Sequence, residues 1–225
     1  MLFDIDHTLI DSGGAGALAL NLAFQDVTGI VNGFSGIGFA GKTDLKIIRD
    51  ALEKHHIEIQ DGWLGRFLDV YLIHLHTATS RRMGRVKPGV PDLLDALSKD
   101  QDFQLGLLTG NIEEGARIKL EPFALNRFFP VGAFGSDSED RNALLPLAVQ
   151  RLAANSSVLI GCGDCVIIGD TPLDVACAKA NGARSIAVAT GPYAIEALRE
   201  SDADLVMRDL SDTDKVINWL KNLVP

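Results

Sequence analysis

The chain has 225 residues, of which 47% are hydrophobic, and this is enough apolar material for the core of one domain and of a smaller second one. Its net charge of −9 argues against nucleic acid or an anionic membrane as a partner, because either would require a basic face. An anionic substrate must therefore be met by a few locally placed cations. The three cysteines, an odd number, are typical of the reduced thiols of a cytoplasmic protein rather than of a disulfide framework.

The first predicted strand, residues 1–5, leads into two carboxylates, Asp4 and Asp6. Residues at i and i+2 leave a strand on the same side, so this pair can hold a divalent cation while one member attacks an electrophile and the other moves a proton. Only three residues precede Asp4, so we expect an unusually short first strand, as if the chain began inside it. The same acidic residues stand where the basic segment of a signal peptide would be, and none is predicted.

Residues 14–86 are predicted to form an inserted helical unit without a strand. Between Thr8 and Thr109 lie 100 residues, whereas a simple strand-helix-strand crossover needs about 30 in total. Helical periodicity covers residues 15–28, 43–55 and 62–79. We therefore predict a core made of residues 1–13 and 87–225 and an all-helical cap, residues 14–86, over the strand ends.

The rest of the chain alternates between helical periodicity and short apolar runs. The predicted helices are residues 90–99, 112–120, 143–154, 173–180, 194–200 and 214–223, and the later strands are residues 104–108, 131–134, 165–168, 185–189 and 204–206. This alternation predicts an α/β fold with a doubly wound parallel sheet. Active groups collect at the carboxyl ends of such strands, where Asp4, Thr109 and Asp170 all fall.

Four motifs occur in a specific order: DIDHT at residues 4–8, LLTGN at 107–111, GDTPLD at 169–174, and the tail VATGPYAIEALRESDADLVMRDL at 188–210. Together they make the chain resemble a haloacid-dehalogenase-superfamily phosphohydrolase with a Rossmann-like core and a helical cap after the first strand. The phosphoglycolate phosphatase-like branch is the most similar. The resemblance covers nearly the whole chain, and four ordered motifs are far more specific than any one of them.

The resemblance implies a role for each acidic residue. Asp4 is the candidate nucleophile, which forms an aspartyl-phosphate, and Asp6 is the candidate general acid and base. Mg²⁺ is the implied cofactor, held by Asp4, the main-chain carbonyl of Asp6 and Asp170. Asp174 is expected either beside this metal site or in it.

The phosphoryl group needs hydrogen-bond donors and a cation. Thr109, with the backbone of Gly110 and Asn111 at a helix N-terminus, is implied to bind the phosphoryl oxygens. The family usually supplies a lysine, but no Lys-Pro dipeptide stands in the expected region, and Arg141 is the candidate instead. Its guanidinium is expected beside Asp4, where it would lower the pKa of that carboxyl group. Lys179 and Lys119 are the alternatives for this role.

A second phosphate-binding pattern lies in the inserted unit. Residues 36–43, GIGFAGKT, satisfy the P-loop pattern G-x-x-x-x-G-K-[ST], which would indicate a nucleotide-binding kinase. That pattern is meaningful only between a buried strand and a helix, and residues 29–34 make a poor central strand. Otherwise these residues form a cap loop in which Lys42 meets the anionic substrate.

The sequence thus predicts a Mg²⁺-dependent phosphohydrolase that acts on a small phosphorylated metabolite as a monomer or small homo-oligomer. A dehalogenase or a phosphonate-cleaving relative would lack the second carboxylate, so Asp6 argues against both. A phosphomutase would retain both Asp4 and Asp6 and stays open as an alternative. The cap sequence alone does not identify the substrate.

Overall fold

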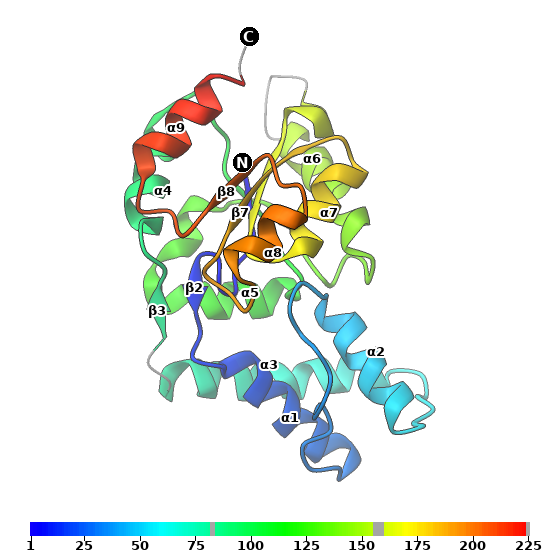
Figure 1. The fold of residues 1–225 in the computed structure, drawn as a ribbon. Coiled ribbons are helices and arrows are strands. Elements are labelled where there is room, and N and C mark those ends of the chain that lie inside the picture. The colour runs from blue at the N-terminus through cyan, green and yellow to red at the C-terminus, as the bar shows by residue number, and fades with distance from the viewer. Residues whose placement is uncertain (82–83, 155–159, 224–225) are drawn as a thin grey trace.

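A computed structural model describes residues 1–81, 84–154 and 160–223. Its centre is a six-stranded sheet in the order β5-β4-β1-β6-β7-β8, and every neighbouring pair is parallel (Figure 1). The strands are β1 (Leu2–Phe3), β4 (Gly106–Leu108), β5 (Gly132–Ala133), β6 (Val166–Gly169), β7 (Arg184–Val188) and β8 (Leu205–Met207). The predicted parallel α/β sheet is therefore confirmed.

Helices cover both faces of the sheet because its strands are apolar on both sides. Leu2 belongs to the hydrophobic cluster on one face and Phe3 to the cluster on the other, as successive strand residues must. The helices are α4 (Val90–Lys99), α5 (Glu113–Leu120) and α9 (Thr213–Lys221) on the Phe3 face, α6 (Leu144–Ala154) and α7 (Pro172–Ala180) on the Leu2 face, and α8 (Ile195–Glu200) beside β7 and β8.

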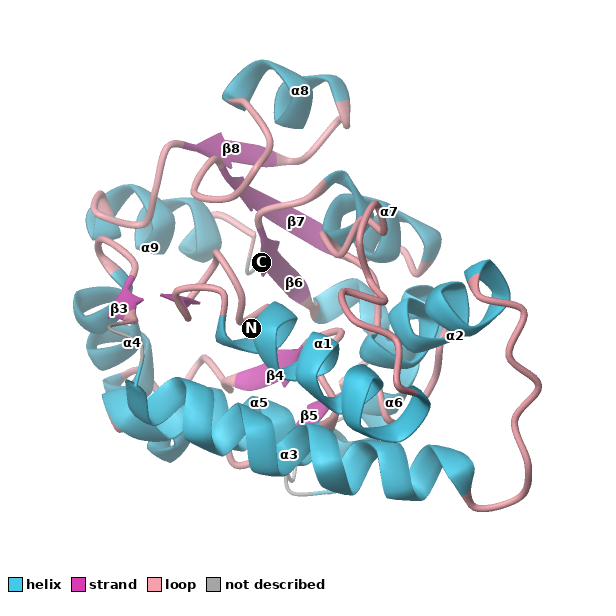
Figure 2. Ribbon diagram, turned by 90° about the horizontal axis from the view of Figure 1, so that it is seen from below, coloured by secondary structure: helices cyan, strands magenta, loops and turns pink. Residues whose placement is uncertain are grey.

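The inserted segment contains the three predicted helices, α1 (Ala15–Thr28), α2 (Asp44–Lys54) and α3 (Trp63–Arg81). They enclose a hydrophobic cluster of their own, in which the rings of Trp63 and Phe67 stack at 5.1 Å between centroids. Figure 2 shows α1 and α3 running alongside each other across one end of the sheet. A separate core of this kind supports the proposed division into core and cap.

One prediction about this segment is wrong, because it contains a strand. β3 (Arg85–Val86) pairs antiparallel with β2 (Ile10–Asp11), so that the two chain connections to the helices form a short ribbon. Two residues give no readable alternation, and the pairing joins positions far apart in the sequence, so local pattern could not reveal it. The predicted limits of residues 14 and 86 stay a prediction.

The segment before α2 packs tightly on the loop that follows β4. The backbone N–H of Asp44 donates to the carbonyl oxygen of Gly110 at 2.7 Å, and the Asp44 carboxylate accepts from the N–H of Ile112 at 3.0 Å. Thr43 caps α2 and donates its hydroxyl to the carbonyl of Glu139 at 3.0 Å. Cap and core are therefore joined at the LLTGN motif itself.

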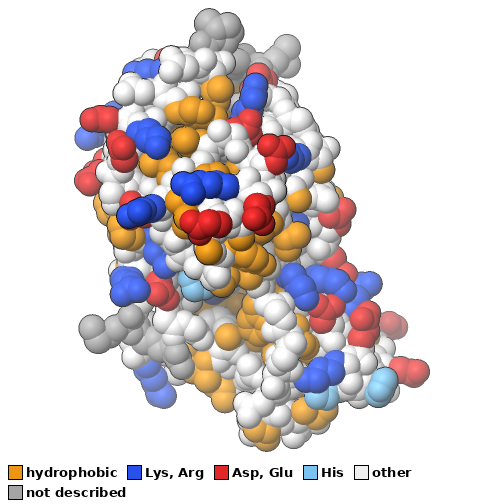
Figure 3. All heavy atoms as spheres, viewed as in Figure 1, with side chains coloured by type: hydrophobic (Ala, Val, Ile, Leu, Met, Phe, Trp, Pro, Cys, Tyr) orange, Lys and Arg blue, Asp and Glu red, His pale blue; other side chains and the backbone are white. Residues whose placement is uncertain are grey.

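The described surface gives no indication of a membrane span. Among the described residues, no helix combines the length and the apolar character that crossing a membrane requires. On the face drawn in Figure 3, acidic and basic side chains are interspersed with apolar ones, so neither sign of charge dominates that face.

Replacement of Gly110 by alanine should loosen the contact between cap and core. A Cβ at this position would lie 2.1 Å from the carbonyl oxygen of Lys42, which is backbone and cannot move aside alone. We expect Gly110→Ala to lower the free energy of unfolding by about 1–3 kcal/mol, the usual cost of overpacking. Gly65→Ala is the control, because Gly65 is an exposed residue of α3 with open space around it and should gain stability as alanine. Urea unfolding of both variants measures this, and an unchanged midpoint for Gly110→Ala would contradict the packing described.

Candidate active site

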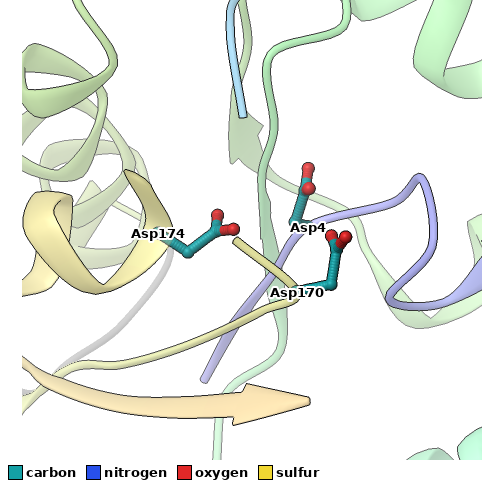
Figure 4. A group of neighbouring side chains, drawn as sticks. All are labelled: Asp4, Asp170 and Asp174. Carbon is teal, nitrogen blue, oxygen red and sulfur yellow. The ribbon is translucent and has the colours of Figure 1, made fainter. Parts of the chain in front are cut away.

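Three buried carboxylates meet at the carboxyl ends of β1 and β6. The backbone N–H of Asp4 donates to the carbonyl of Ile168 at 2.9 Å, which fixes Asp4 beside the end of β6, where Asp170 follows. Asp174 reaches the same place from the first turn of α7 (Figure 4). One oxygen of each carboxylate lies within 4.8 Å of the others, and all three residues are buried.

Burial raises the pKa of two of these groups, and the neighbouring carboxylates add to the effect. Burial raises the pKa of Asp4 to about 6, against the opposing effect of Arg141. Burial, followed by the charges of Asp4 and Asp174, raises the pKa of Asp170 to about 8. Arg141 lowers the pKa of Asp4 as expected, but desolvation outweighs this effect, so the net pKa of Asp4 lies above its usual value.

The structure places Arg141 at this cluster. It opens a short 3₁₀ turn, Arg141–Ala143, and its Nη2 lies 3.4 Å from Oδ1 of Asp4 while also bonding to Asp174. The second oxygen of Asp174 accepts from the N–H and the hydroxyl of Thr171. Both oxygens of Asp174 are thus engaged by protein groups, which favours a role in orienting Arg141 over direct metal ligation.

The donor set fits a divalent cation. Oδ2 of Asp170 is buried and has no hydrogen-bond partner among the described residues, while Oδ1 accepts from the hydroxyl of Thr8 at 3.3 Å. A Cβ at Gly191 would lie 1.7 Å from Oδ2 of Asp170, so only glycine leaves room there. A buried, unpartnered carboxylate oxygen among further carboxylates is the oxygen-rich environment that Mg²⁺ or a similar ion requires.

Asp6 belongs to a different set of contacts. Its Oδ2 accepts from Nζ of Lys119 at 2.6 Å and from Nδ2 of Asn111 at 2.9 Å, and its Oδ1 accepts from the hydroxyl of Ser12 at 3.4 Å. Oδ1 of Asn111 accepts from Nζ of Lys119 at 2.5 Å, and Nδ2 of Asn111 donates to the hydroxyl of Thr109 at 2.8 Å. Burial would raise the pKa of Asp6, but the charge and hydrogen bonds of Lys119 and Asn111 outweigh it and leave that pKa below its usual value.

Two backbone N–H groups at the start of α5 are already engaged by protein groups. The N–H of Ile112 is taken by Asp44, and the N–H of Glu113 donates to the hydroxyl of Ser136 at 3.2 Å. Of the predicted phosphate-binding group, Thr109 is buried beside Asp4, and its hydrogen bond lowers the pKa of that group. Gly110 and Asn111 line a cavity that lies between the core and the cap.

Lys42 and Lys179, the two other lysines of the sequence-based hypothesis, form ion pairs away from Asp4 and Asp6. The ammonium group of Lys42 pairs with Asp50 at 2.7 Å, although the residue lines the cavity. Lys179 pairs with Asp202 on the surface. The P-loop pattern lies in the connection between α1 and α2, whose residues are all described and contain no strand, so the context that a nucleotide-binding loop requires is missing.

Sequence reasoning missed the partners that the cap and α5 bring to the site. Lys119 was considered only as a phosphate-binding cation, yet it lies on the buried face of α5, seven residues after Ile112. A lysine at a position where helical periodicity calls for an apolar residue was the available signal. Asp44 and Tyr71 gave no such signal, because each is an ordinary residue of an amphipathic helix until the tertiary fold places it.

These residues surround one cavity of about 200 Å³ between core and cap. Four buried side-chain atoms lack a hydrogen-bond partner among the described residues, and three belong to residues that line this cavity: Oδ2 of Asp170, Nε of Arg141 and the hydroxyl of Tyr71. Buried polar groups are normally paired, so an acceptor, a donor and a hydroxyl left over at one place indicate a binding site for a cation and an anionic ligand.

Comparison with known proteins gives consistent matches. The sequence profile described as haloacid dehalogenase-like hydrolase matches residues 1–188. A phosphoglycolate phosphatase from Pseudomonas savastanoi pv. phaseolicola is 25% identical over 216 residues, which cover 93% of this chain and 76% of that protein. Among solved structures, a hydrolase from Pseudomonas syringae has a TM-score of 0.70 at 20% identity, with 100% of this chain and 98% of that chain covered. A haloacid dehalogenase hydrolase from Entamoeba histolytica has a TM-score of 0.71 at 17% identity, with 98% of both chains covered. At these identities the solved structures show a shared fold.

Metal binding should appear as a gain in thermal stability. Mg²⁺ that binds only the folded state stabilises it by mass action, by about 2.7 kcal/mol at a concentration 100 times its dissociation constant. We expect the melting temperature to rise with added MgCl₂ and this rise to disappear in Asp170→Asn, which removes the unpartnered oxygen's charge. Asp202→Asn is the control, because Asp202 pairs with Lys179 on the surface. Equal magnesium shifts in the wild type and Asp170→Asn would show that the ion binds elsewhere.

Proposed function

This chain belongs to the haloacid dehalogenase-like hydrolases, and on that premise we propose that it is a Mg²⁺-dependent phosphatase that cleaves a small phosphomonoester through an aspartyl-phosphate at Asp4. One observation carries the proposal: two neighbouring carboxylates, Asp4 and Asp6, have separate cationic partners. Arg141 lies beside Asp4 and Lys119 beside Asp6. Because each carboxylate has a cation of its own, the two can take different roles, Asp4 as the nucleophile and Asp6 as the proton carrier. The names of the curated relatives support the phosphatase assignment.

Each residue then has a definite task. Asp4 attacks phosphorus and forms an acyl phosphate, while Asp6 gives a proton to the departing alcohol oxygen. Lys119 stabilises the Asp6 carboxylate left by this transfer, and that carboxylate then takes a proton from the water that hydrolyses the acyl phosphate. Arg141 and Thr109 bind phosphoryl oxygens. When bound by Asp4 and Asp170, Mg²⁺ would neutralise the charge that gathers around the transferring group.

A phosphomutase would use the same acidic residues, so the fate of the phosphoryl group decides between the two. We propose transfer to water. Release of inorganic phosphate in step with substrate loss supports this, whereas conversion of one phosphorylated isomer into another without release supports a mutase. The three free thiols favour the cytoplasm as the compartment in which this chemistry occurs.

The proposal predicts that Asp4→Asn abolishes phosphate release from any phosphomonoester, because an amide cannot act as the nucleophile. Asp6→Asn should abolish release from alkyl phosphates and should leave the magnesium-dependent rise in melting temperature in place. Inorganic phosphate is measured with an aryl and an alkyl phosphate, and Asp202→Asn serves again as the surface control. Near wild-type turnover by Asp4→Asn would rule out covalent catalysis at this residue.

Lys119 is expected to act on the reaction through Asp6, and the leaving group reveals this. An aryl oxide departs without a proton, whereas an alkoxide needs one, so only alkyl esters depend on a well-placed acid in the first step. Lys119→Met should lower kcat/KM for an alkyl phosphate about 10²-fold, the scale of general acid catalysis, and change kcat/KM for an aryl phosphate by only a few-fold.

Lys119→Arg tests whether charge alone is sufficient, since it keeps the cation and should restore part of the loss. If Lys119 binds the phosphoryl group itself, Lys119→Met will lower kcat/KM for both esters by the same factor.

A further inference from the structure

Part of the cap wall of the cavity is apolar. Ala17 and Leu20 of α1, Phe39 of the following loop and Ile47 of α2 face the space above the core carboxylates. These side chains come from separate elements of the cap, yet together they form one hydrophobic side of the cavity. The alcohol part of a phosphomonoester bound at Asp4 would lie against this wall, because the core side holds the phosphoryl group.

The lysines and the arginine that line the cavity are each already paired. Arg141 contacts Asp4 and Asp174, and Lys119 contacts Asp6. Lys42 contacts Asp50, a carboxylate that it shares with Lys46. The other ionisable group that the cap contributes to the lining, besides Tyr71, is the carboxylate of Asp44, which is buried and itself negative when ionised. A second anionic group on the substrate would therefore lose its hydration and would have to compete with a protein carboxylate for any lysine or arginine of the described lining, whose other basic residue is His7.

One polar atom on the cap side does lack a partner. Tyr71 of α3 is fully buried, its ring packs in the cap's hydrophobic cluster, and its hydroxyl makes no hydrogen bond to any described group. Buried tyrosine hydroxyls usually find a partner, and leaving one unpaired is costly. Because Tyr71 lines the cavity, a hydroxyl or carbonyl of a bound ligand is a suitable partner.

The size of the cavity limits the substrate further. About 200 Å³ is below the range of roughly 300–1,000 Å³ that is usual for ligand pockets, so the phosphoryl group leaves room for only a few carbon atoms.

Resting on the proposed phosphatase function, we propose that the leaving group is a small uncharged alcohol. Its carbon atoms pack on Leu20, Phe39 and Ile47, and its one further hydroxyl or carbonyl bonds to Tyr71. Esters whose alcohol carries a carboxylate are the poorer substrates. This preference would separate the chain from the relatives that are named for phosphoglycolate.

Two esters that differ in size by a single oxygen atom test the proposal. In 2-hydroxyethyl phosphate a hydroxymethyl group replaces the carboxylate of phosphoglycolate, and the rest of the molecule is the same. We expect kcat/KM to be about 10-fold or more higher for 2-hydroxyethyl phosphate, the scale of a polar group buried without compensation. A preference for phosphoglycolate, or no preference, overturns the proposal.

Tyr71→Phe tests the hydroxyl contact. Propyl phosphate matches 2-hydroxyethyl phosphate in length but lacks the hydroxyl group. Tyr71→Phe should lower kcat/KM for 2-hydroxyethyl phosphate to the value for propyl phosphate and leave propyl phosphate unchanged. Tyr193→Phe is the matched control, because Tyr193 is not among the residues that line the cavity. If Tyr71→Phe slows both esters equally, the hydroxyl does not bind the alcohol and the assignment fails.

An aryl phosphate separates failure of this inference from failure of the phosphatase proposal. If the protein does not hydrolyse the aryl ester, or hydrolyses it without needing Asp4, the phosphatase proposal itself is refuted. Aryl hydrolysis that depends on Asp4, combined with preferred cleavage of phosphoglycolate, would leave the phosphatase standing and refute only the uncharged leaving group.

Discussion

The structure depends on the burial of several carboxylates in one place. Asp4, Asp170 and Asp174 share a space in which their oxygens lie within 4.8 Å, and ionised groups that close repel strongly when water is excluded. Arg141 offsets part of this repulsion, but burial, followed by the neighbouring carboxylates, still raises the pKa of Asp4 to about 6 and that of Asp170 to about 8. The protein alone leaves this site short of positive charge, and a divalent cation is the simplest remedy.

Asp6, the second carboxylate of the proposed mechanism, is held apart from this cluster. Asp6 is only two residues from Asp4, but its oxygens are held by Lys119, Asn111 and Ser12 instead of sharing Arg141. The pKa of Asp4 is thus raised and that of Asp6 is lowered, although only one residue separates them in the sequence. Each carboxylate therefore has its own cationic partner, Arg141 for Asp4 and Lys119 for Asp6.

The cap contacts the loop that organises this chemistry. Asp44 holds the N–H of Ile112 and the carbonyl of Gly110, which flank Asn111, and Asn111 in turn contacts Asp6 and Lys119. Movement of the cap would therefore disturb the surroundings of Asp6 directly. The coupling passes through hydrogen bonds to backbone, so it depends on the position of α2 more than on the identity of distant side chains.

Much of the fold could be predicted because the chain's apolar pattern is local and strong. The buried strands β4 and β6 follow continuous apolar runs, and α1 and α4 have the predicted bounds. The ribbon of β2 and β3 could not be predicted, because two-residue strands leave no period.

The acidic residues of the site could be named from their motifs, since each follows a strand at the same edge of the sheet. The partners of these residues were harder to predict, because they are distant in the sequence. Asp6 and Lys119 are 113 positions apart, and Asp44 and Ile112 are 68 positions apart. The unpartnered hydroxyl of Tyr71 is a property of the packed structure and has no counterpart in the sequence.

The central claim is that Asp4 carries the phosphoryl group during turnover. The most direct measurement is an acid quench of the enzyme during steady hydrolysis of an aryl phosphate, followed by digestion and mass spectrometry of the N-terminal peptide. The account predicts a phosphoryl group on Asp4 that disappears when the substrate is exhausted. An unmodified peptide under conditions in which phosphate is being released, or a phosphoryl group on another residue, would contradict it.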